Sequence, residues 1–67
     1  MKLDKTRLDL AMGRKCMMRS DVAETVGISR HTLSRIYNGY ECRPATAGKI
    51  AQALGVDLTE IMEEVKP

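Results

Sequence analysis

The chain has 67 residues, and its only aromatic side chains are two tyrosines. A chain this short forms one small domain that buries only about 60% of its unfolded surface, so an enclosed enzyme pocket has little room and dimerisation would add stability. The remaining large apolar residues are Leu, Ile, Val and Met, which favour a bundle of short helices over a sheet. We predict a single all-α domain over residues 1–67.

Positive charge is concentrated in the middle of the chain, although the formal net charge is only +2. Residues 30–43 carry three arginines against one glutamate, whereas residues 44–67 carry two lysines against four acids. This distribution favours a nucleic-acid partner more than the net charge does. The sequence also has no signal peptide and no long apolar run, so we expect a cytoplasmic protein with no membrane partner.

The first predicted helix covers residues 4–15. Asp4 is a suitable N-cap, and an apolar stripe at helical spacing comes after it. The stripe that should face the core consists of Leu8, Ala11 and Met12.

Residues 20–39, SDVAETVGISRHTLSRIYNG, contain two short helical patterns joined by a glycine. Val22, Ala23 and Val26 share one face of the first pattern. Gly27 can adopt the left-handed conformation that ends a helix, and Ile28 can then fill the angle between the two helices.

The second helix of this pair should begin at about Arg30, because Ser29 is a good N-cap, and should end before Asn38-Gly39. Leu33 and Ile36 are three positions apart and should point inward. Arginine, histidine and serine side chains then occupy the outer face, which is typical of a DNA-reading helix-turn-helix. These outer residues are Arg30, His31, Ser34 and Arg35.

A loop should come next, with Pro44 biasing Arg43 towards an extended conformation, and a fourth helix should cover residues 45–54 and end at Gly55. Gly48 in its middle suggests close packing against a neighbouring helix, because glycine there costs about 1 kcal/mol relative to alanine. The expected core residues are Ala47, Ile50, Ala51 and Leu54.

A last short helix is expected near residues 58–64, with Asp57 or Thr59 as its cap. Its apolar residues are Ile61, Met62 and Val65. With this segment the prediction is a compact bundle of five helices.

Taken together, these patterns resemble the phage repressor and Cro type of helix-turn-helix domain, also called the XRE family, over nearly the whole chain. The resemblance implies a lambda-repressor-like fold. It rests on the joint spacing of Val22-Ala23, Gly27, Ser29, Leu33, Ile36, Asn38-Gly39, Arg43-Pro44 and the run KIAQALGV at 49–56.

The resemblance implies a motif at about residues 19–37 whose recognition helix, about residues 30–37, lies in the major groove. Arginine suits base reading because its planar fork donates two hydrogen bonds to guanine. Arg30 and Arg35 lie roughly 140° apart on a helix, so they should address different positions. The candidate base-contacting residues are Arg30, His31, Thr32, Ser34 and Arg35, and the candidate backbone-contacting residues are Arg19, Ser29, Asn38, Tyr40 and Arg43.

Three of these assignments have alternatives. The alternative for His31 is an exposed polar residue without a role. The alternative for Tyr40 is an apolar lid over the loop. Arg43 could instead reach the minor groove, where narrow A·T-rich segments attract arginine.

The chain departs from the family pattern in three places. Met18 stands where a Ser or Thr cap is usual, so the cap either falls to Ser20 or is missing. Cys16 occupies a position that is often glycine, which suggests a strained or differently shaped turn. Met12 and Tyr37 replace an Arg and Glu ion pair, and we expect an apolar contact between them.

Neither a metal site nor a catalytic site is predicted. Cys16 and Cys42 lack the close pair spacing of zinc modules, and we expect both to be reduced thiols. Ser29 and His31 are neighbours in sequence, but a capping role explains Ser29 better than a nucleophilic one. We expect no enzyme activity and no cofactor.

The leading hypothesis is therefore a sequence-specific transcriptional regulator, most simply a repressor that occupies a palindromic operator in double-stranded DNA as a homodimer. Core packing and a dimer interface are competing uses for the last apolar residues. The alternative is a protein-interaction module such as an antitoxin, although an antitoxin often needs a further segment and this chain ends at residue 67. The candidate dimer residues are Ile61, Met62 and Val65.

Overall fold

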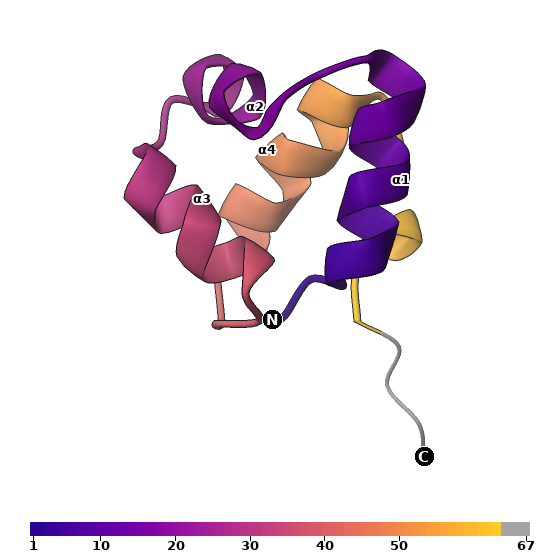
Figure 1. The fold of residues 1–67 in the computed structure, drawn as a ribbon. Coiled ribbons are helices and arrows are strands. Elements are labelled where there is room, and N and C mark those ends of the chain that lie inside the picture. Colours follow the sequence, from indigo (N-terminus) through magenta and orange to yellow (C-terminus); the bar gives the residue numbers. More distant parts are fainter. Residues whose placement is uncertain (64–67) are drawn as a thin grey trace.

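The computed structural model describes residues 1–63, which form four α-helices and one 3-10 turn. The elements are α1 (Lys5–Lys15), α2 (Arg19–Val26), α3 (Arg30–Tyr37), α4 (Pro44–Leu54) and the 3-10 helix η1 (Leu58–Glu60). Helix α4 packs against α1, α2 and η1, and α2 packs against α3 (Figure 1). The all-α fold class is confirmed, but the predicted fifth α-helix is wrong.

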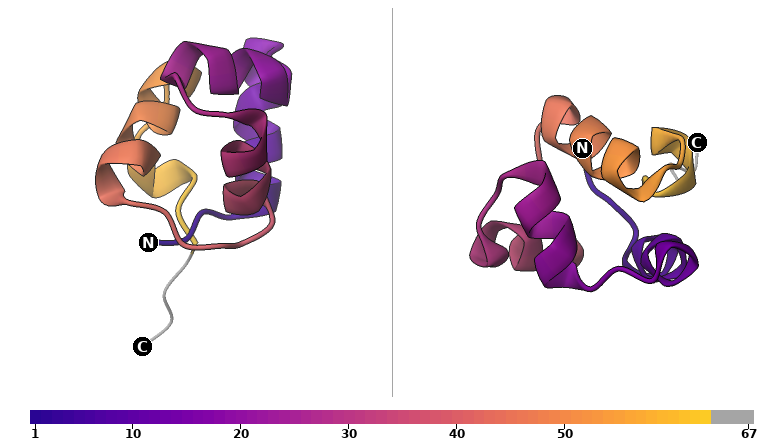
Figure 2. Two further views of the ribbon diagram at one scale, coloured as in Figure 1. Left: turned by 90° about the vertical axis from the view of Figure 1, so that its left-hand side faces the viewer. Right: turned by 90° about the horizontal axis from the view of Figure 1, so that it is seen from above.

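One hydrophobic core joins the four helices. All the apolar residues predicted to face inward on α1, α3 and α4 are buried, and so are Val22 and Ala23 on α2, with Val26 half-buried. Leu3, Tyr37 and Ile61 complete the core. The right-hand view in Figure 2 shows α1 on one side of the molecule and the α2–α3 pair on the other, with α4 running along a third side next to both. Because α4 contributes to both sides of the core, it fixes the orientation of the helix pair.

Local signals set the helix starts much as predicted. Asp4 caps α1 by accepting a hydrogen bond from the Arg7 backbone N–H at 3.0 Å. Helix α4 begins at Pro44, one residue earlier than predicted, because proline's fixed φ and missing N–H suit the first helical position. Arg43 before it is extended, with φ −71° and ψ 145°.

The turn between α1 and α2 contains the one non-glycine residue with positive φ among residues 1–63. Cys16 ends α1 in the left-handed region, with φ 54° and ψ 38°, a conformation that is unfavourable for a non-glycine residue, so the strain suggested for this turn is present. Met18, rather than Ser20, occupies the N-cap of α2. Its backbone N–H donates to Oδ2 of Asp21 at 2.8 Å, so a carboxylate in the first turn supports the helix start where no cap hydroxyl is present.

Gly48 does not mark a close helix contact, so that prediction is wrong. A β-carbon added there would meet no heavy atom within 4 Å outside its own helix backbone and chain neighbours. Gly55, in contrast, ends α4 with φ 68° and lies beside Lys15, whose Cε would be 2.9 Å from an added β-carbon.

The segment after α4 forms only the three-residue η1, because residues 61–63 pair with the N-terminal residues. Asp57 caps η1, accepting from the Thr59 N–H at 3.2 Å. The Asp4 N–H then donates to the Ile61 carbonyl at 2.8 Å, and Leu3 and Met62 form an isolated antiparallel bridge. The Glu63 N–H donates to the Lys2 carbonyl at 2.9 Å, so beyond η1 the chain pairs with the N-terminal residues and does not continue as a helix. The predicted helix over residues 58–64 also included one residue outside the described part of the chain.

No helix of the described residues has the length and apolar character needed to span a membrane.

Candidate nucleic-acid interface

The turn that presents α3 forms as predicted. Gly27 ends α2 with φ 84°, and its N–H donates to the Ala23 carbonyl at 2.9 Å. Ser29 caps α3 by accepting from the Thr32 N–H at 3.0 Å, and its hydroxyl donates to Oγ1 of Thr32 at 2.8 Å. Because the cap uses the Thr32 oxygen as an acceptor, the Thr32 hydroxyl proton stays free for another partner.

Helix α3 divides into a buried face and a polar outer face. Leu33, Ile36 and Tyr37 are buried, whereas Ser34 is half-buried. The exposed side chains include all the other candidate base-contacting residues, namely Arg30, His31, Thr32 and Arg35.

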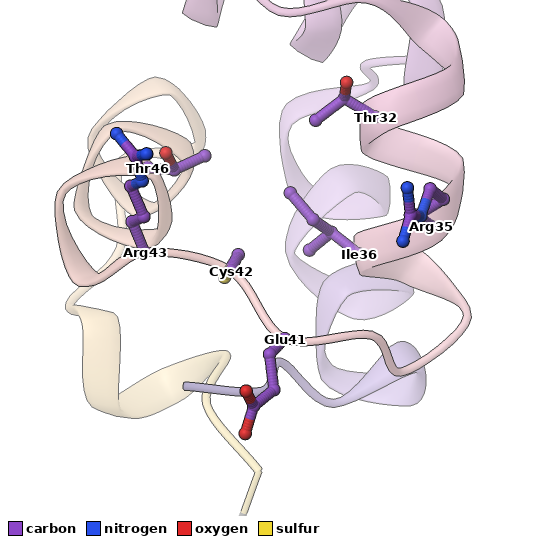
Figure 3. Close-up of a pocket in the computed structure, with 7 residues that line it drawn as sticks. All are labelled: Thr32, Arg35, Ile36, Glu41, Cys42, Arg43 and Thr46. Atoms are coloured by element: carbon purple, nitrogen blue, oxygen red, sulfur yellow. The ribbon is translucent and has the colours of Figure 1, made fainter.

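An open groove of about 530 Å³ lies on one side of α3 (Figure 3). Arg35 borders it from α3, and Arg43 and Thr46 border it from the start of α4 on the opposite side. The loop between the helices closes one end of the groove. Its lining residues are Thr32, Arg35, Ile36, Glu41, Cys42, Arg43 and Thr46.

A smaller depression lies on another side of α3. It is lined by Arg19 from the start of α2 together with Arg30, Leu33 and Ser34 from α3. The two arginines expected to read bases therefore border different depressions. An arginine expected to contact the DNA backbone lines each depression as well. Arg30 shares its depression with Arg19, and Arg35 shares its groove with Arg43.

Tyr37 holds Arg19 at its position. The guanidinium carbon of Arg19 lies 4.6 Å from the centre of the Tyr37 ring, and Lys5 Nζ lies 5.1 Å from the same centre. A guanidinium over an aromatic face gains cation–π attraction while its N–H groups remain able to donate. Arg19 is thus oriented without losing its donors.

An apolar contact was expected between Met12 and Tyr37, but the sequence did not indicate the polar partner that Tyr37 has in the structure. Both side chains are buried in the one core cluster. The Tyr37 hydroxyl, however, donates to Oδ1 of Asp9. Sequence reasoning missed Asp9, although a buried tyrosine usually needs a polar partner for its hydroxyl.

The hydrogen bond to Asp9 is the main reason that the pKa of Tyr37 is raised above its usual value. Burial and the negative charge of Asp9 raise it further, whereas the positive charge of Arg19 lowers it.

Tyr40, the second residue after the Asn38 C-cap of α3, packs its ring beside an arginine. Its side chain is 57% exposed, and its ring lies 5.1 Å from the guanidinium carbon of Arg35. Asn38, the other candidate between α3 and Arg43, is exposed at the C-cap of α3.

The N-terminus lies against the loop that borders the groove. The Cys42 N–H donates to the Met1 carbonyl at 2.8 Å, which sequence reasoning did not predict. Burial raises the pKa of the Cys42 thiol, and the nearby N-terminal ammonium lowers it by a smaller amount. Both cysteines are free thiols.

The candidate dimer residues have different environments. The side chain of Ile61 is fully buried in the core, which leaves none of its surface for a partner chain. Met62 is half-buried at the edge of that core. Val65 lies outside the described residues.

Comparison with solved structures supports this fold, whereas comparison with curated proteins gives no match. Three solved structures are similar at 22% identity over the whole chain: a mutant hydroxyethylphosphonate dioxygenase with a TM-score of 0.83, PhpD with cadmium and hydroethylphosphonate with 0.81, and native PhpD with cadmium with 0.82. The chain spans only 15% of each of those proteins, so the likeness concerns the fold of one region.

The family profile of the Cro/C1-type helix-turn-helix DNA-binding domain matches residues 7–67. That range includes all four α-helices except the first two residues of α1, and it includes both depressions beside α3. The chain therefore belongs to the Cro/C1-type helix-turn-helix family of DNA-binding domains.

Proposed function

We propose that this DNA-binding domain is a transcriptional regulator that recognises a specific operator and represses by occupying it. The observation that carries the proposal is the placement of Arg30 and Arg35 on the exposed face of a capped helix, beside different depressions. Two arginines that point to different positions can each discriminate a base pair by about 1 to 3 kcal/mol.

The flanking arginines support the same orientation on DNA. Arg19 at the start of α2 and Arg43 at the start of α4 are both exposed. Phosphate contacts on both sides of a recognition helix would fix its register without reading sequence. The helix N-terminal dipoles favour an anion at the same two places.

A homodimer on a palindromic site completes the proposal, because one short helix reads only a few base pairs. Two copies would place their recognition helices in half-sites about 34 Å apart. Met62 is the remaining described candidate for the contact between copies, since the core already uses Ile61.

Selection of bound duplexes from a randomised DNA library at near-physiological salt tests this function. We expect a palindromic motif with half-sites about one helical turn apart. On the selected site, Arg30→Ala should cost about 1 to 3 kcal/mol and relax the preference at one position. Recovery of no motif, with binding that disappears as salt rises, would refute specific recognition and favour a protein-interaction role such as that of an antitoxin.

A further inference from the structure

Each of the chain's two tyrosines lies beside an arginine of the DNA-binding surface. The guanidinium of Arg19 lies over the Tyr37 ring, and the guanidinium of Arg35 lies over the Tyr40 ring. The guanidinium carbons are 4.6 Å and 5.1 Å from the respective ring centres. The chain has no phenylalanine or tryptophan, so these two rings are its only aromatic platforms. Tyr37 also belongs to the core, but Tyr40 is exposed and has no comparable packing role.

The end of α3 places Tyr40 beside Arg35 through the backbone. Gly39 has φ 95°, which reverses the chain after the helix. The Gly39 N–H then donates to the Ile36 carbonyl at 3.1 Å, and the Tyr40 N–H donates to the Arg35 carbonyl at 3.0 Å. These two bonds form a Schellman motif. Tyr40 is therefore attached to Arg35 at the backbone as well as through its ring.

This contact has a defined consequence for base recognition. An exposed arginine has many rotamers, and binding must select one of them. A ring that attracts the guanidinium reduces the number of rotamers that Arg35 populates in the DNA-free protein. The N–H donors of the guanidinium remain available for a guanine edge. Arg35 also borders the groove opposite Arg43, so the selected rotamers lie on the surface assigned to DNA (Figure 3).

We propose that Tyr40 is a positioning residue for Arg35, whose guanidinium it holds ready to read a base. The inference rests on the proposed function and refines it, because it replaces a direct phosphate contact by the Tyr40 hydroxyl with an indirect role of the ring. The ring, and not the hydroxyl, is then the part of Tyr40 that DNA recognition needs.

The test compares Tyr40→Phe, which keeps the ring, with Tyr40→Leu, which keeps apolar bulk without the ring. Dissociation constants are measured on the selected duplex and on a duplex altered at the base pair whose preference Arg35→Ala relaxes. We expect Tyr40→Phe to bind within about twofold of the wild type, and Tyr40→Leu to lose about 2- to 10-fold in affinity together with discrimination at that base pair. In the Arg35→Ala background, Tyr40→Leu should have no further effect.

A measurement on the DNA-free protein examines the contact independently. The Arg35 Nε–Hε resonance should be shifted by the aromatic ring in the wild type and in Tyr40→Phe, and the shift should be lost in Tyr40→Leu. Thermal unfolding checks that the variants are folded, which the exposure of Tyr40 leads us to expect.

Each other outcome overturns a defined part of the inference. If Tyr40→Phe is as weak as Tyr40→Leu, the hydroxyl contacts DNA and the positioning role is wrong. If Arg35→Ala weakens binding but Tyr40→Leu does not, or if the two losses add, only the positioning role fails. If the wild type selects no sequence at all, the proposed function fails first, whatever the resonance shows.

Discussion

The Tyr37 hydroxyl on α3 donates a hydrogen bond to Oδ1 of Asp9 on α1, joining residues 28 positions apart. The guanidinium of Arg19 lies over the same ring, and Arg19 is the first residue of α2. Tyr37 therefore connects α3 to the two helices before it. This arrangement leaves Arg19 oriented at the start of α2, beside the depression that it shares with Arg30.

Tyr37→Phe should lower stability, because the ring is kept but Asp9 loses its donor. The pKa of Tyr37 is raised, so the folded state retains the phenolic proton more strongly than the unfolded state does. The associated stability is complete below about pH 10 and is lost as the pH rises through the folded-state pKa. Thermal unfolding from pH 8 to 11 should show a loss of stability in both proteins, because both contain the same lysines. The loss should be larger in the wild type than in Tyr37→Phe. Parallel curves would argue against the pKa shift.

Arg19→Ala should weaken binding to all DNA sequences alike. One phosphate contact contributes about 1 to the slope of log affinity against log salt, so the slope should fall by about that amount. Arg14→Ala is the matched control, since Arg14 is an exposed arginine of α1 that pairs with Glu60 at 3.7 Å. An equal change in both variants would mean that net charge, and not the place of Arg19, determines the effect.

Gly48→Ala should stabilise the fold by about 0.5 to 1 kcal/mol, because alanine is the better helix former and an added β-carbon meets no neighbouring element. Gly27→Ala also meets no neighbouring atom, but its φ of 84° is unfavourable for alanine. That variant should lose about 1 kcal/mol. Denaturant unfolding of both variants measures the difference, and a loss of stability in Gly48→Ala would restore a packing role for this glycine.

Cys16→Gly should stabilise the protein by about 0.5 to 1 kcal/mol, because glycine adopts the left-handed conformation at this position without strain. Cys16→Ala removes the thiol but keeps the unfavourable φ, and it should give no such gain. If chemical denaturation shows that both variants gain equally, the thiol and not the backbone is responsible.

Much of the local structure could be predicted from the sequence. The caps Asp4 and Ser29, the turn glycine Gly27, and the inward stripe of each α-helix all lie where their patterns indicated. These signals act within a few residues, through hydrogen bonds to nearby N–H groups and through helical periodicity, so a single sequence contains them in full.

The wrong predictions concern segments that respond to distant parts of the chain. The expected last helix is replaced by a short turn because residues 61–63 pair with residues 2–4. Gly48 was expected at a close contact that the packing of α4 does not make. Neither outcome has a local signal.

The sequence by itself determined the helix-turn-helix, the start of α3 and the candidate arginines on the outer face of that helix. Only the tertiary structure decided how Arg19 is held, because its ring contact joins α2 to the end of α3. It also decided the pairing of Tyr37 with Asp9 and the burial of Ile61. Such contacts depend on the relative positions of whole helices, which arise from packing of the shared core and not from the residues next to each side chain.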